Sequence, residues 1–129
     1  MQKNSISNRI DSYRRALEKL RAVLEQPKTD TTRDASIKRF EFTYELAWKS
    51  IQDFLREQGI VCASPKGCLK EAFKFGLIPD NPLWTKIIDD RNLTVHTYDE
   101  GIAEDIYSRL KSYIPLFEEL LNNMIKMIK

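Results

Sequence analysis

Residues 31–58 read TTRDASIKRFEFTYELAWKSIQDFLREQ, and this stretch decides the fold. Its main apolar side chains recur at spacings of three and four residues, which is the period of an α-helix. We expect a Thr-x-x-Asp capping box of Thr31 and Asp34 to begin the helix and Gln58-Gly59 to end it. Other apolar side chains lie off the main stripe, so this helix should touch several neighbours; they are Phe42, Leu46, Trp48 and Leu55.

Helical patterns continue on both sides of this stretch. Residues of about 5 to 25 carry a similar apolar stripe that stops at Gln26-Pro27. Ser64-Pro65 has the form of a helix cap followed by a proline in the first turn, and the short helix that it begins should stop near Gly76. Asp80-Asn81-Pro82 repeats the same device.

The second half of the chain is expected to contain two more helices. One begins after Pro82 and runs as far as Val95. The last follows a Thr97-x-x-Glu100 capping box, and Pro115 should kink it. No segment alternates with a period of two, so we predict an all-α, up-and-down bundle of about five helices, a single domain over residues 1–129.

Composition narrows the class of protein. The chain has 129 residues, with 42% hydrophobic and 31% charged residues, which suits one globular domain. Its net charge of +2 is too small to identify a nucleic-acid binder by charge alone. The four glycines form neither a Gly-x-Gly-x-x-Gly nor a Gly-x-x-x-x-Gly-Lys loop, so a nucleotide phosphate has no such cradle.

The cysteines and the N-terminus suggest a cytosolic protein. Cys62 and Cys68 lack the spacing of a zinc or thioredoxin-type site, and we expect two reduced structural thiols. Residues 1–5 show no apolar leader, and no apolar run approaches the roughly 18 residues that cross a bilayer. We therefore expect a cytoplasmic location and no membrane partner.

Candidate chemistry gathers around the single histidine, His96, whose imidazole is suited to proton transfer near neutral pH. On an ideal α-helix Asn92 shares its face, whereas Arg91 lies about 140° away. The Arg91 side chain bends round, or the helix ends early, or a second copy of the chain completes the site. A guanidinium beside an imidazole suits cleavage of a phosphodiester. The plainer reading pairs Arg91 with a nearby carboxylate and makes His96 a capping residue.

Three blocks resemble one family. Residues 91–98, RNLTVHTY, resemble the Arg-x4-His-x-Tyr motif of HEPN proteins. Residues 40–49, FEFTYELAWK, are similar to the second-helix signature of the HEPN subgroup called nucleotidyltransferase substrate-binding proteins. Residues 70–78, KEAFKFGLI, are similar to its short third-helix region. The blocks follow the family's order and cover nearly the whole chain.

The resemblance implies a dimeric helical bundle that is the toxin of a toxin–antitoxin pair, with a minimal nucleotidyltransferase (MNT) as antitoxin. Its catalytic members are endoribonucleases that need no metal and no cofactor. Carried over to this sequence, Arg91 would stabilise the scissile phosphate, His96 would act as general acid or base, and Asn92 would orient one of them. Tyr98 matches the tyrosine that the MNT partner adenylylates, and AMP there would obstruct the site.

Simpler interpretations stand beside each assignment. Asp89 and Asp90 would adjust the electrostatic environment of the Arg91 guanidinium, or Asp90 would simply form a surface ion pair with Lys86. Aromatic residues such as Trp48 and Trp84 fit core packing better than base stacking. The basic residues of the first helix fit a solvated face better than an RNA track; they are Arg9, Arg14, Arg15, Lys19 and Arg21.

Two other function classes compete with the RNA-cleaving toxin. The first is a non-catalytic subunit that docks on a nucleotidyltransferase and presents a nucleotide or another substrate to it. The second is an inert helical interaction protein, which would leave Arg91, Asn92, His96 and Tyr98 without a purpose.

Overall fold

The computed structural model describes residues 2–128, and side-chain burial from residue 6 onward. Over these residues the fold is all-α, with five α-helices and one 3-10 turn. The bounds are α1 Gln2–Leu24, α2 Asp30–Glu57, α3 Pro65–Phe75, α4 Leu83–Leu93, η1 Thr94–His96 and α5 Glu100–Met127. The predicted fold class is confirmed.

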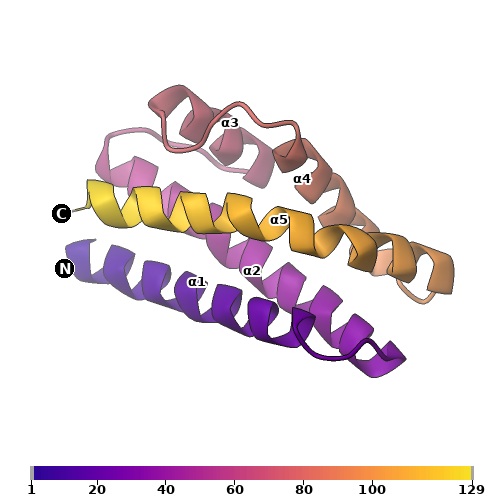
Figure 1. Ribbon diagram of the computed structural model, residues 1–129. Helices are drawn as coiled ribbons and strands as arrows, with labels where there is room; N and C mark the ends of the chain where they lie inside the picture. Colours follow the sequence, from indigo (N-terminus) through magenta and orange to yellow (C-terminus); the bar gives the residue numbers. More distant parts are fainter. Residues whose placement is uncertain (1, 129) are drawn as a thin grey trace.

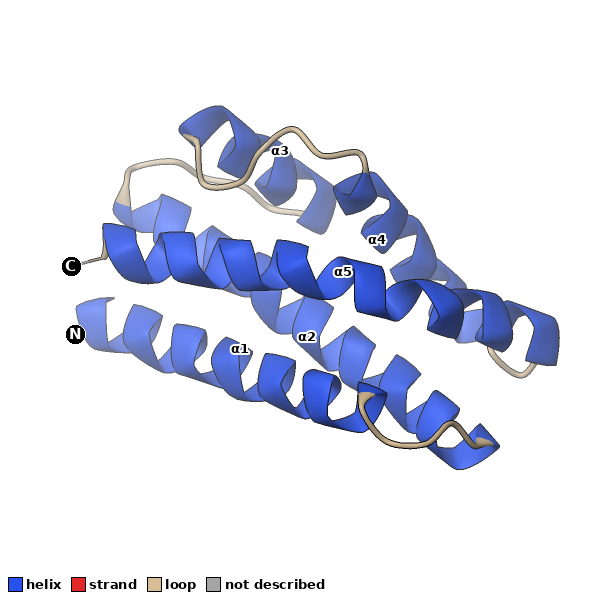
Figure 2. Cartoon of the chain, viewed as in Figure 1, coloured by secondary structure: helices blue, strands red, loops and turns tan. Residues whose placement is uncertain are grey.

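Three long helices form the body of the bundle, and two short ones cover one side (Figure 1). Helix α2 packs against α1, α3, α4 and α5, which confirms its predicted central position. The two ends of the chain lie together, and the α4–α5 connection lies at the opposite end of the bundle (Figure 2). The residues from 91 to 98 are therefore at an exposed end of the bundle.

The core is built from the apolar stripes of the three long helices. Phe40 of α2 lies against Tyr113 and Phe117 of α5, with ring centroids 5.9 and 6.4 Å apart. The Tyr13 hydroxyl of α1 donates to the Phe117 carbonyl oxygen at 2.6 Å, so this buried polar group is satisfied. Burying such aromatic side chains stabilises the bundle by roughly 1.5–3 kcal/mol each.

Helix starts were only partly predicted. Thr29, not Thr31, caps α2, and it shares a reciprocal capping box with Thr32. Asp99, not Thr97, caps α5. Several threonines and aspartates lie close to each start, and their spacing alone does not show which one turns its oxygen toward the helix.

The caps of the short helices follow the prediction more closely. Ser64 accepts from the Gly67 amide, Pro65 is the first residue of α3, and Gly76 ends the helix at φ +90°. Helix α4 begins at Leu83, directly after Pro82 as expected, and the Asn81 side chain accepts from the Leu83 amide at 2.9 Å. Helix α5 continues through Pro115 as one element, and a kink there stays a prediction.

Cys62 and Cys68 form a disulfide, so the expectation of two reduced thiols is wrong for this structure. The loop after α2 turns back so that the two Cα atoms lie 5.1 Å apart, which is within the usual range for a disulfide. The bridge ties the loop to the first turn of α3. Pattern reading missed it because neither cysteine belongs to a recognised spacing.

Candidate functional site

Arg91 lies in the last turn of α4, and its contacts run toward α2 and η1. The guanidinium donates from Nη1 to the Thr94 Oγ1 at 3.2 Å, and the same nitrogen lies 4.0 Å from the Glu41 Oε2. Its side chain is 31% exposed. No hydrogen bond or ion pair within the described part of the chain uses Arg91 Nε or Nη2.

The neighbouring Asp90 is fully buried and points into the bundle. Arg109 of α5 donates to its two oxygens at 2.7 and 2.8 Å, and the Tyr113 hydroxyl donates to it as well. The predicted surface pair with Lys86 is therefore wrong. Asp90 fixes α4 on α5 immediately before Arg91.

Sequence reasoning missed Arg109 and Tyr113. They are four residues apart on one face of α5. The only local sign of a buried ion pair was an arginine placed one turn before a tyrosine of the apolar face. Burial raises the pKa of Tyr113 well above its ordinary value, and the Asp90 carboxylate raises it further. The pKa of Arg109 is also raised, chiefly by its hydrogen bonds to Asp90.

His96 and Tyr98 form the second part of the site. The His96 Nδ1 lies 3.1 Å from the Tyr98 hydroxyl oxygen, and the two rings meet edge to face. Both side chains are exposed, Tyr98 by 82%. An imidazole held through Nδ1 keeps Nε2 available for proton exchange, and no hydrogen bond within the described residues uses Nε2.

The early end of α4 separates these two parts. After Leu93 the chain continues as a 3-10 turn, so Val95 is outside the helix and 64% exposed. Of the three alternatives that the sequence leaves open, the structure shows the early helix end. Even so, no hydrogen bond joins Arg91 to His96 within the described residues, and the exposed Asn92 side chain makes none there either.

A polar hollow of about 460 Å³ borders the site between α2 and η1. Glu41 and Thr94 line it together with Tyr98, so the contacts of Arg91 and the exposed tyrosine share one depression. Burial raises the pKa of the nearby Tyr44 to about 12, while the charge of Arg91 opposes this rise. Arg91 therefore acts electrostatically on the adjoining core.

Most of the basic residues of α1 form ion pairs with acidic residues of the same chain. Arg9 pairs with Asp53 at 3.0 Å, and Arg14 and Arg15 share Asp11 at 2.8 Å. Arg21 pairs with Glu118. These pairs favour the solvated-face reading over an RNA track.

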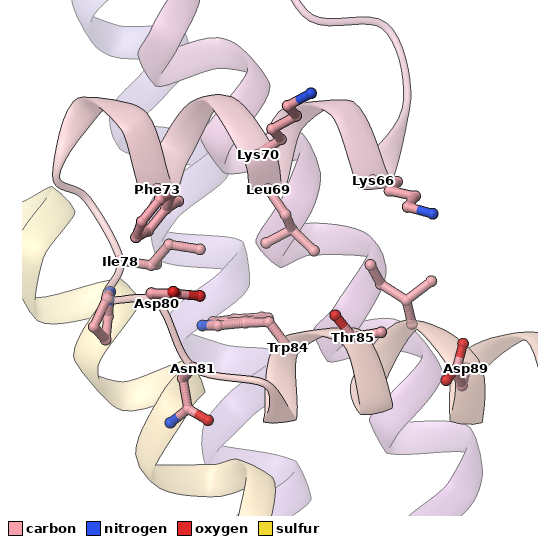
Figure 3. Close-up of a pocket in the computed structure, with 12 residues that line it drawn as sticks. Lys66, Leu69, Lys70, Phe73, Ile78, Asp80, Asn81, Trp84, Thr85 and Asp89 are labelled. Atoms are coloured by element: carbon pink, nitrogen blue, oxygen red, sulfur yellow. The ribbon is translucent and has the colours of Figure 1, made fainter.

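An apolar cavity of about 310 Å³ lies elsewhere, between α3 and α4. Leu69, Phe73 and Ile78 face Trp84 and Thr85 across it (Figure 3). The Trp84 indole packs on Phe117 with ring centroids 5.7 Å apart, which agrees with the predicted core role. Arg91, Asn92, His96 and Tyr98 do not line this cavity, whereas Asp89 does.

Two negative findings concern residues 2–128 alone. No group of three or more histidine, cysteine, aspartate or glutamate side chains there is arranged to hold a metal ion. None of the helices described is long and apolar enough to cross a membrane.

Comparisons with known proteins place these features in a family context. The family model described as nucleotidyltransferase substrate binding protein like matches residues 8–126. A probable ribonuclease HepT from Haemophilus influenzae is 37% identical over 90 residues, which make up 66% of this chain. The match spans 62% of that relative's own length, less than two thirds.

Solved structures agree with the fold. A protein of Thermus thermophilus superposes with a TM-score of 0.82 and 40% identity, covering 87% of this chain and 98% of that one. A Haemophilus influenzae protein, described as a substrate binding domain of a nucleotidyltransferase, gives a TM-score of 0.69 and 30% identity. That alignment covers 95% of this chain and 98% of the other.

Proposed function

Because this chain belongs to the nucleotidyltransferase substrate-binding protein family, which is of the HEPN type, we propose that it is a metal-independent endoribonuclease. We assign it as the toxin of a HEPN/MNT pair. The observation that carries the proposal is the Nε/Nη2 edge of the partly exposed Arg91, which has no partner among the described residues, in a segment that ends in the His96–Tyr98 contact. A guanidinium edge of this kind binds two phosphate oxygens.

The chemistry needs few groups. The ribose 2′-oxygen attacks the adjacent phosphorus, the bond from phosphorus to the 5′-oxygen breaks, and a 2′,3′-cyclic phosphate and a 5′-hydroxyl result. Arg91 would stabilise the charge that develops on the phosphate oxygens. His96 would take the 2′-hydroxyl proton or supply one to the leaving 5′-oxygen, and Asn92 would orient one of these two side chains.

A homodimer would supply the two proton-transfer groups that this reaction needs. Each chain has one histidine, whereas attack and departure call for a base and an acid. Two copies that face one groove would supply two imidazoles and two guanidinium groups. The absence of an Arg91–His96 hydrogen bond within the described part of one chain is consistent with a site completed by a second copy.

An MNT nucleotidyltransferase is the proposed antitoxin in the cytoplasm. In the inactivating step the Tyr98 oxygen attacks the α-phosphorus of ATP, pyrophosphate leaves, and the phenol proton passes to a base of the partner. Tyr98 is 82% exposed, and its hydroxyl oxygen lies 3.1 Å from the His96 Nδ1. The AMP would then crowd His96 and place negative charge where the RNA phosphate binds.

The decisive experiment incubates cellular RNA in EDTA with protein whose intact mass shows no AMP. We expect cleavage that yields cyclic phosphate ends and that disappears in His96→Ala. The matched control is Asp105→Ala, an exposed residue of α5 outside the assigned catalytic group. If the unmodified native protein cuts no RNA, the ribonuclease proposal fails.

Two observations favour a second candidate function. No hydrogen bond joins Arg91 to His96 among the described residues, and a structural relative carries the description of a substrate binding domain. A non-catalytic subunit would dock on a nucleotidyltransferase and present a substrate there. Binding to the nucleotidyltransferase without RNA cleavage, retained in His96→Ala, would support it.

A further inference from the structure

We propose that Glu41 is a positioning residue that acts through Thr94 to hold Arg91 with its phosphate-binding edge outward. This inference rests on the proposed function, because it concerns the same anion site. Glu41 lies on α2, 53 residues before Thr94, and no motif connects the two in sequence. Only the fold brings them together.

The contact from Glu41 reaches the junction of α4 and η1. The Thr94 hydroxyl donates to Glu41 Oε2 at 3.0 Å, and only 7% of Thr94 is exposed. Thr94 is the residue at which the α-helix changes to the 3-10 turn. Glu41 therefore anchors the point where the segment carrying Arg91 meets the segment carrying His96.

The Thr94 hydroxyl has one proton and two nearby acceptors. One is Glu41 Oε2, and the other is the Arg91 carbonyl oxygen at 2.6 Å. An ionised carboxylate is the stronger acceptor of the two, whereas the carbonyl contact is the shorter one, so the proton is shared between them. With the proton on either side, the hydroxyl oxygen keeps a lone pair to accept from Arg91 Nη1 at 3.2 Å.

A comparison of Arg91 with Arg109 of the same chain shows which guanidinium nitrogens of Arg91 remain available for a ligand. Arg109 binds the two oxygens of Asp90 with Nε and Nη2, which form one side of the planar guanidinium. Arg91 is held by Nη1 alone, so its corresponding Nε/Nη2 side has no partner among the described residues. The Glu41–Thr94 contact thus orients Arg91 without occupying the side that binds a phosphate.

Charge explains why Glu41 does not compete with the phosphate. Its Oε2 is 4.0 Å from Arg91 Nη1, a loose pair, and its Oε1 lies 3.2 Å from the Lys38 ammonium. The carboxylate is therefore shared between a lysine, a hydroxyl and a guanidinium. It aligns Arg91 and leaves much of the guanidinium charge for a ligand.

The first test is a kinetic double-mutant cycle. We expect Glu41→Ala and Thr94→Val each to lower kcat by about 10- to 100-fold, since small misplacements of a catalytic group cost this much. The double variant should be no slower than the slower single variant, because both changes break the same chain of contacts from Glu41 through Thr94 to Arg91. Thr94→Ser should restore cleavage to within about threefold, because it keeps the hydroxyl.

Lys49→Ala is the matched control. It removes the partner of Glu45 on the same helix and leaves the Glu41–Thr94 contact intact, so cleavage should stay near the native rate. Multiplicative losses in Glu41→Ala/Thr94→Val would mean that the residues act separately and would overturn the proposal. A Thr94→Ser variant as slow as Thr94→Val would also overturn it.

A second readout keeps this inference separate from cleavage. Binding of an RNA with a 2′-deoxy substitution at the scissile position is measured by fluorescence anisotropy. Thr94→Val should weaken binding in the native background and have no effect in Arg91→Ala. If the native protein binds this way yet cuts no RNA, the ribonuclease proposal fails while the positioning role stands. An equal effect in both backgrounds, or no binding by the native protein, would overturn the role.

Discussion

Asp90 accepts two parallel hydrogen bonds from Arg109, with Nε at 2.8 Å and Nη2 at 2.7 Å. The carboxylate is fully buried, whereas the arginine side chain is 30% exposed. The Tyr113 hydroxyl donates to the same carboxylate. Three contacts from α5 therefore fix the residue that directly precedes Arg91, and the α4 end of the site is anchored on the core.

Removing the Asp90 charge should destabilise the whole domain. Asp90→Asn leaves the Arg109 guanidinium without its counter-charge, and losing one partner of a buried ion pair costs about 3 kcal/mol. Urea unfolding followed by circular dichroism measures the change. The matched control, Asp89→Asn, alters an exposed neighbour and should shift the free energy of unfolding by less than about 0.5 kcal/mol.

The raised pKa of Tyr113 predicts a loss of stability at alkaline pH. The folded state keeps the phenol proton because burial and the Asp90 charge disfavour the phenolate. A raised folded pKa gives a contribution that is complete below the unfolded pKa near 10 and declines as pH rises above it.

Tyr113→Phe isolates this effect. The native protein should be the more stable of the two below pH 10, and the difference should shrink steadily toward pH 11.5. Chemical unfolding at a series of pH values measures it. A difference that stays constant above pH 10 would contradict the assignment of a raised pKa to Tyr113.

Reducing the Cys62–Cys68 disulfide should weaken the domain without unfolding it. The bridge closes a short loop, with a sequence separation of 6, for which chain entropy predicts about 2 kcal/mol of stabilisation. Intact mass after alkylation, with and without dithiothreitol, reports the state of the pair. Cys62→Ser/Cys68→Ser should match the reduced protein, and equal stability of all forms would contradict the prediction.

Mixing native and inactive chains tests whether the site is shared between copies. If the shared groove needs both imidazoles, unfolding and refolding equal amounts of native protein and His96→Ala together should leave roughly a quarter of native cleavage, because only about a quarter of the random dimers have two native chains. Independent sites in each chain would leave about half. A value of one half, from dimers shown to exchange by mass spectrometry, would rule out a site that needs both imidazoles.

Tyr98→Phe should block AMP transfer by the MNT partner; because it also removes the hydroxyl that contacts His96 Nδ1, the readout is AMP transfer and not cleavage. The substitution removes the oxygen that would carry AMP but leaves the aromatic ring beside His96. Intact mass after incubation with the nucleotidyltransferase, ATP and magnesium measures the transfer. Tyr107→Phe is the control tyrosine on α5 and should still gain AMP at Tyr98. Equal labelling of Tyr98→Phe would place the modification elsewhere.

Local periodicity predicted most of the fold. The three–four rhythm identified α2 and its neighbours because burial of one helical face repeats along a short stretch of chain. It placed the end of α4 too late, at Val95, because the following turn continues a helical φ/ψ path while its hydrogen bonds change. Propensity carries little information on that distinction.

Non-local pairing explains what the sequence could not predict of the site. Asp90 matched a surface pattern with Lys86, yet its partners lie 19 and 23 residues further along on α5. Glu41 belongs to a block that resembles the family, but its contact with Thr94 needs α2 and α4 to cross first. The disulfide likewise depends on a loop path that no spacing rule describes.

The change of helix type after Leu93 divides the motif into two halves of unequal rigidity. Arg91 follows a carboxylate anchored in the core, whereas His96 and Tyr98 lie in a turn held by local bonds, such as Thr97 Oγ1 to the Thr94 carbonyl oxygen. Amide hydrogen exchange should accordingly be slow at Asp90 and fast after Thr94. A ligand at this site thus meets an arginine that is supported by the core and a histidine that is supported only by its own turn.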